Sequence, residues 1–68
     1  MPSTVIARSS YDAQSGRLTV QFVSGRRYLY FDVPPDVAAQ LDAAASKGGY
    51  FNRAVRDRYR FLELEPAA

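Results

Sequence analysis

The feature that most constrains the fold of this chain is a change in the spacing of its apolar residues near position 34. Before it, Leu18, Val20 and Phe22 alternate with polar residues, which is the period that places every second side chain on one face of a β-strand. After it, Val37 and Leu41 lie one helical turn apart. The change therefore predicts a sheet formed by the first half of the chain and helices formed by the second.

Three stretches before that change have strand character, over residues 4–12, 17–23 and 26–33. Two short gaps that contain glycine, DAQSG and SG, separate them. Consecutive strands joined by gaps this short pair antiparallel. We therefore expect a three-stranded antiparallel meander.

Two short helices are predicted after the meander. The first opens at two prolines, which suit a first helical turn, and stops at Gly48 and Gly49. We expect Gly48 to adopt the left-handed conformation that ends many helices. The second helix carries Phe51, Val55 and Tyr59 on one stripe.

The predicted fold class is therefore α+β, with a three-stranded antiparallel meander followed by two short helices packed on one face, in the order β-β-β-α-α. We expect a single domain over residues 3–61 and a C-terminal tail over 62–68. The alternative for the sequence FLELE, which begins at residue 61, is a brief fourth strand.

The register of the second and third strands decides which way Tyr28 and Tyr30 face. A loop with an even number of residues, centred on positions 24 and 25, puts both tyrosines on the polar side of the sheet. A three-residue loop exchanges the faces, so that Tyr28 pairs with Phe22 under the helices. The loop residues leave both registers open. In the even loop Gly25 is second, whereas a type II′ turn needs glycine first, and in the three-residue loop the left-handed position falls on Arg26.

The chain is small, and it contains neither cysteine nor histidine. A chain of 68 residues forms a thin core, and association often stabilises such domains, so a homodimer is one expectation. The usual catalytic base, the soft nucleophile and the commonest ligand of transition metals are all missing. We expect a protein that is not an enzyme, with no catalytic residues, no metal site and no cofactor.

Nothing in the sequence predicts contact with a membrane. No stretch approaches the roughly 20 apolar residues that span a bilayer as a helix, and the first residues lack the pattern of a signal peptide. We therefore expect a cytoplasmic protein without a membrane partner.

The most suggestive functional segment runs from Lys47 to Arg60 and holds five cations and one acid. A lysine and two glycines at a helix start can present backbone N–H groups to an anion. Arginines interleaved with aromatic residues suit single-stranded nucleic acid, where cations hold phosphates and rings stack on bases. The competing interpretation is a joint between two helices followed by a solvated helix face. The candidate nucleic-acid-binding residues are Lys47, Gly48, Gly49, Tyr50, Arg53, Arg56, Arg58 and Arg60.

The order of several short motifs resembles the KTSC domain, a module found alone in bacterial and phage proteins and at the C-terminus of some lysyl-tRNA synthetases. The hallmark of that family is a central Tyr-x-Tyr, here Tyr28 and Tyr30. The resemblance runs from about Ser3 to Tyr59 and is carried by STVI, the pair YD at 11–12, LTVQF, the turn at Gly25, YLYFDVP and ASKGGYFNRAVRDRY. It implies a connection with RNA through the synthetases, and mainly structural tyrosines that face the core with their hydroxyls at its edge.

The sequence supports two hypotheses of different class. The first is a small non-enzymatic module that binds RNA through the basic helix-end surface, and it predicts binding that weakens steeply with salt. The second is a protein–protein interaction module, whose strand at 26–33 pairs with a second copy or another protein because it is apolar on both faces. That association would survive salt and depend on Leu29 and Phe31.

Overall fold

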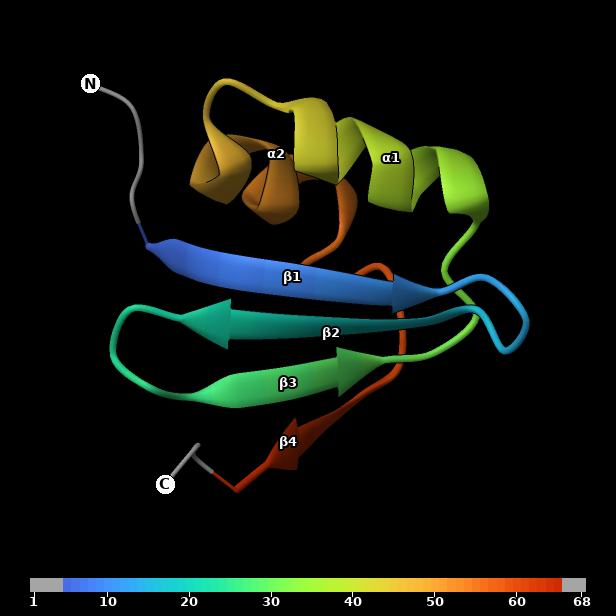
Figure 1. Ribbon diagram of the computed structural model, residues 1–68, viewed down its shortest axis with the longest axis horizontal. Helices are drawn as coiled ribbons and strands as arrows, with labels where there is room; N and C mark the ends of the chain where they lie inside the picture. The colour runs from blue at the N-terminus through green and yellow to red at the C-terminus, as the bar shows by residue number, and fades with distance from the viewer. Residues whose placement is uncertain (1–4, 66–68) are drawn as a thin grey trace.

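The computed structural model describes residues 5–65 and contains a four-stranded antiparallel sheet with two helices packed on one of its faces (Figure 1). The strands are β1 (Ile6–Asp12), β2 (Arg17–Phe22), β3 (Arg27–Tyr30) and β4 (Phe61–Leu64), and the helices are α1 (Pro35–Ala43) and α2 (Lys47–Ala54). The strands lie in the sheet in chain order, and both helices come between β3 and β4. The α+β class is confirmed, whereas the strand count is four and not the predicted three.

Strand β4 lies where the sequence favoured the start of a tail. Phe61 pairs with Tyr30, and Leu62 pairs with Leu29, so the element order is β-β-β-α-α-β. A segment of four residues shows too little alternation to be distinguished from a tail by its own sequence. Its partner β3 decides the matter, because it supplies both the hydrogen bonds and the tyrosine rings that Phe61 contacts. The predicted domain start at residues 3 and 4 and the tail residues 66–68 lie outside the described residues.

The position of β4 also corrects one form of the protein-interaction hypothesis. Strand β3 is hydrogen-bonded to β2 on one side and to β4 on the other. Its backbone is therefore not available to pair with a strand of another chain, and the strands at the two edges of the sheet are β1 and β4.

The loop between β2 and β3 determines the orientation of Tyr28 and Tyr30. It has three residues, 23–25, because the N–H of residue 22 donates to the carbonyl of Arg26. Tyr28 therefore pairs with Val20, and both tyrosines face the helices. The predicted partners are displaced by two residues, because the left-handed position falls on Gly25 (φ +96°) and not on Arg26. A displacement of two preserves the face, so the core-facing orientation is confirmed.

The core lies between the inner face of the sheet and the two helices. In β2 the fully buried residues are the alternate Leu18 and Val20, and in the helical half they include Leu41 and Val55. The predicted apolar stripe of the second helix therefore packs inward, and Tyr59, which follows the helix, is half-buried against the core. The complete set of buried apolar residues is Ile6, Leu18, Val20, Tyr30, Val33, Ala38, Leu41, Phe51 and Val55.

The first helix ends earlier than predicted. Helix α1 stops at Ala43, where the N–H of Ala44 donates to the carbonyl of Leu41 at 3.3 Å. Gly48 is buried in the first turn of α2, and it is not among the residues with a positive φ. The prediction that Gly48 ends the first helix in a left-handed conformation is therefore wrong. Within residues 5–65, neither helix is long and apolar enough to cross a lipid bilayer.

Candidate functional site

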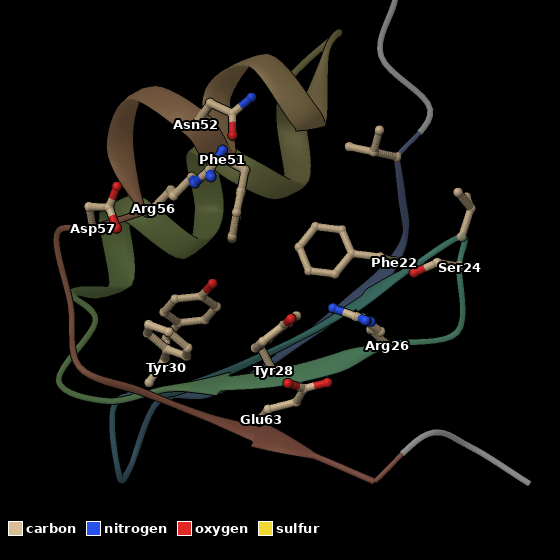
Figure 2. A pocket seen from close by; sticks show the side chains of 13 residues that line it. Phe22, Ser24, Arg26, Tyr28, Tyr30, Phe51, Asn52, Arg56, Asp57 and Glu63 are labelled. Carbon is tan, nitrogen blue, oxygen red and sulfur yellow. The ribbon is translucent and has the colours of Figure 1, made fainter.

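An open groove of about 770 Å³ lies between α2, the turn that follows it, and strands β3 and β4 (Figure 2). Five aromatic side chains line it and contact one another in series, with ring centroids 5.4 to 5.7 Å apart: Phe22, Tyr28, Tyr30, Phe51 and Phe61. Most of these pairs meet edge to face, the arrangement that aromatic rings prefer. We call this feature the aromatic groove.

The rim of the aromatic groove is unusually apolar for a surface. Val5, Val23 and Phe61 line it with 45%, 65% and 54% of their surface exposed. Single exposed apolar side chains are ordinary, but a group around one hollow is typical of a binding site. The volume also falls within the range of about 300–1,000 Å³ that small-ligand sites occupy.

Each end of the aromatic groove carries one arginine and one acid (Figure 2). Arg26 and Glu63 lie at the Tyr28 end, and a hydrogen bond with Tyr28 raises the pKa of Arg26. Arg56 and Asp57 lie at the other end. Both arginines are exposed, and in the described part of the chain neither is within ion-pair distance of an acid. Arg56 is therefore available to an anion, and Arg26, which is hydrogen-bonded to Tyr28, has further N–H donors for one.

The two tyrosines of the groove differ in environment. Tyr30 is 5% exposed and belongs to the core, whereas Tyr28 is half-buried and reaches the open part of the groove. Burial raises the pKa of Tyr30 to about 12, with smaller contributions from Tyr28 and Asp57 that Arg56 opposes. Tyr30 therefore keeps its proton at any physiological pH.

The predicted anion site at the start of α2 is engaged in joining the helices. The Nζ of Lys47 donates to the backbone carbonyl of Asp42 at 2.6 Å, at the end of α1. The Oγ of Ser46 accepts from the N–H of Gly49 at 3.3 Å and caps α2. These contacts favour the interpretation of this segment as a joint between helices, since the Lys47 ammonium and the Gly49 N–H already have partners.

The structure does not gather the remaining predicted residues on one surface. Tyr50 and Arg53 line a second hollow between the helices, with the guanidinium 5.9 Å from the ring centroid. Arg56 lines the aromatic groove, whereas the exposed Arg58 lines neither hollow. Arg60 lies near Phe31 on the face of the sheet that is turned away from the helices. Of the eight candidates, Arg56 alone lines the groove that holds the tyrosine pair.

Several groove residues were missed by the sequence reasoning. From the sequence, Phe22 lies on the apolar face of its strand, Phe61 ends the domain, and neither Arg26 nor Glu63 is a candidate site residue. No local signal marks Phe61 and Glu63, because alternation in FLEL would bury the two leucines, whereas Leu62 is 56% exposed. Among residues 5–65, no cluster of three or more acidic, cysteine or histidine side chains could hold a metal ion.

Comparison with known proteins places the same region in a family. The KTSC domain matches residues 2–59. A lysine–tRNA ligase of Nostoc punctiforme is 43% identical over 61 residues, which cover 90% of this chain but only 11% of the ligase. A protein of Tsukamurella paurometabola is 39% identical over 62 residues, covering 91% and 92% of the two chains. The crystal structure of a KTSC domain protein from Yersinia pestis superimposes with a TM-score of 0.88 at 25% identity, over 96% of this chain and 92% of that one.

Proposed function

The chain belongs to the KTSC domain family, and on that premise we propose that it is a non-enzymatic module that binds single-stranded RNA by holding an unpaired base in the aromatic groove. One observation carries the proposal: Phe22, Tyr28 and Phe61 border an open groove above the buried rings of Tyr30 and Phe51, between two arginines that have no acidic partner within ion-pair distance in the described residues. Unpaired bases are held in this way by proteins, with rings against the base and cations on the flanking phosphates.

The polar groups at the groove ends suit a nucleobase better than a purely apolar ligand. Asn52, Asp57 and Glu63 line the groove beside the arginines, and amide and carboxylate groups can form hydrogen bonds with the edge of a base. The lysine–tRNA ligases that share this domain act on an RNA, and the chain spans about a tenth of their length. The cytoplasmic location predicted from the sequence belongs to the same proposal.

Binding of fluorescently labelled oligouridine and oligoadenosine of roughly ten nucleotides, followed by anisotropy, tests this function. The substitution Tyr28→Ala should weaken binding by roughly five-fold or more, because stacking of one base contributes about 1–3 kcal/mol. The matched control is Tyr50→Ala, which removes a tyrosine that lies outside the groove. Equal affinities of the two variants and the unaltered protein would contradict a base in the groove.

A charge-reversal pair separates a local effect at the groove from an effect of overall charge. Arg56→Glu should weaken binding clearly, because the guanidinium lies at one end of the groove. Arg58→Glu makes the same change in net charge two residues further on, at an exposed side chain that does not line the groove. If both reversals reduced affinity equally, only the overall charge would matter, and the proposed site would be wrong.

A further inference from the structure

The face of the sheet that is turned away from the helices, here called the outer face, carries a second surface that the aromatic groove does not use. The register assigns its side chains, because residues paired across the strands point to the same side. Three cross-strand rows form it: Arg8, Gln21, Arg27 and Leu64; Ser10, Thr19, Leu29 and Leu62; and Asp12, Arg17, Phe31 and Arg60.

The outer face is basic. Four arginines belong to it, and two acids, Asp12 and Asp32, lie on or beside it. With Asp32 included, the outer face therefore has a net charge of +2. The segment 47–58, where the sequence predicts a basic surface, is positive as well, since it holds four cations and one acid. The outer face is thus a second basic surface of the molecule.

Phe31 organises two of these arginines. The guanidinium of Arg60 lies 5.2 Å from the centroid of the Phe31 ring, and that of Arg17 lies 5.8 Å from it. Contacts of this kind are favourable and hold both cations over one half-buried ring. The ion pair between Arg60 and Asp32 is long, at 3.9 Å, with both side chains largely exposed. Such a pair contributes little, so Arg60 remains available to an anion.

Charge also decides between two occupants of the outer face. Leu62 is 56% exposed and lies opposite Leu29, so a short apolar strip crosses the face. A second copy of the chain packed on that strip would bring four arginines against four arginines, which is unfavourable. A polyanion would instead neutralise them and release counterions.

We propose that the outer face binds the phosphodiester backbone of the single-stranded RNA whose unpaired base enters the aromatic groove, with phosphates on Arg17 and Arg60. The inference rests on the proposed function and extends it to the opposite face of the sheet. The RNA would pass around the edge strand β4. Arg60, which directly precedes β4, lies on the outer face, and Phe61, the first residue of β4, lines the groove. The path is short, because it crosses only this one edge strand, and Arg60 and Phe61 are adjacent in the chain.

The test measures the salt dependence of RNA affinity for two double variants of equal charge. Arg17→Gln combined with Arg60→Gln removes two cations from the outer face, and Arg53→Gln combined with Arg58→Gln removes two from elsewhere. Between roughly 50 and 200 mM salt, the slope of log K against log salt should fall by about 0.7 for each phosphate that the protein no longer neutralises. We expect a fall of about 1.4 for the outer-face variant and little change for its control.

A third variant distinguishes RNA from a protein occupant. Leu62→Lys adds a cation to the outer face and interrupts the apolar strip. It should strengthen RNA binding and steepen its salt dependence. If the outer face is a dimer interface instead, Leu62→Lys should abolish self-association and leave RNA affinity unchanged, which would overturn the inference.

The remaining outcomes separate this inference from the proposed function. In one outcome, Tyr28→Ala weakens RNA binding, but the salt slope is the same in both double variants and in the unaltered protein. This result would overturn the binding of phosphates on the outer face and support the binding of a base in the groove. An equal reduction of the salt slope in both double variants would also overturn binding at the outer face, because net charge alone would then explain the reduction. Absence of RNA binding by the unaltered protein would overturn both proposals.

Discussion

The tyrosine pair shows how two residues on one face of a strand come to have different tasks. Tyr28 and Tyr30 both point toward the helices, yet Tyr30 is buried in the core and Tyr28 lies at the opening of the aromatic groove. Tyr30 contacts the rings of Phe51 and Phe61, which gives it a structural role. Tyr28 has one open side and is the ring that a ligand can reach.

The burial of Tyr30 has a consequence at high pH. Its pKa is raised from the usual 10.0 to about 12, mainly by burial. The unfolded chain releases this proton at the lower pH, so the free energy of unfolding should lose a contribution as pH rises from about 10 to about 12. Below pH 10 that contribution is fully present. Chemical denaturation as a function of pH, with absorbance of the tyrosinate ion as a second probe, measures the effect.

The variant Tyr30→Phe is the control for that titration. This variant should lack the tyrosine ionisation near pH 12. Its free energy of unfolding should therefore change less between about pH 10 and pH 12. If the last ionisation persists in Tyr30→Phe, another tyrosine is responsible and the assignment is wrong.

At the scale of elements, the joint between α1 and α2 explains a segment that looks functional in the sequence. Ser46 caps α2, and Lys47 donates to the end of α1. Gly49 suits the close approach of the cap, because a Cβ there would lie 3.0 Å from the Oγ of Ser46 and would push it aside. A serine, a lysine and two glycines thus suit both a phosphate site and a helix joint, and their hydrogen-bond partners favour the joint.

Removal of the cap tests this interpretation. Ser46→Ala should lower the free energy of unfolding by about 1 kcal/mol, the usual cost of losing an N-cap, and leave RNA affinity unchanged. Ser46→Asp keeps an oxygen acceptor at the same position and should lose much less. Denaturant titration measures both variants. A weakened affinity for RNA in Ser46→Ala, at unchanged stability, would instead support an anion site at this helix start.

At the scale of the whole molecule, charge separates the two faces of the sheet. The outer face carries four arginines and is net positive, whereas each end of the groove pairs one arginine with one acid. Repulsion between outer faces opposes association through the sheet. The fold buries its apolar residues in one cluster between the two layers, so the single chain has a core of its own.

We therefore expect the protein to sediment as a monomer at low ionic strength, where repulsion between outer faces is strongest. Leu29→Lys should leave the sedimentation coefficient unchanged. A dimer that Leu29→Lys converts to a monomer would show that the apolar strip binds a second copy, and would restore the protein-interaction hypothesis.

The sequence by itself determined those features that depend on neighbours along the chain. The alternation of Leu18 and Val20 assigns the buried face of β2, and the change of period after the prolines assigns the helical half. The side of the sheet on which Tyr28 and Tyr30 lie depends only on whether the loop is odd or even, which the loop residues left open. The resemblance to the KTSC domain favoured the core-facing side, which the structure has, although the predicted partners were displaced by two residues.

The tertiary structure alone decided features that depend on partners distant in sequence. Strand β4 exists because β3 offers it hydrogen bonds and rings, and Lys47 is part of a joint because α1 ends beside it. The aromatic groove joins Phe22, Phe51 and Phe61, which no local period connects. The physical reason is that the spacing of residues along the chain sets the face of a helix or strand on which a side chain lies. The packing of helices and strands against one another sets which residues that side chain contacts.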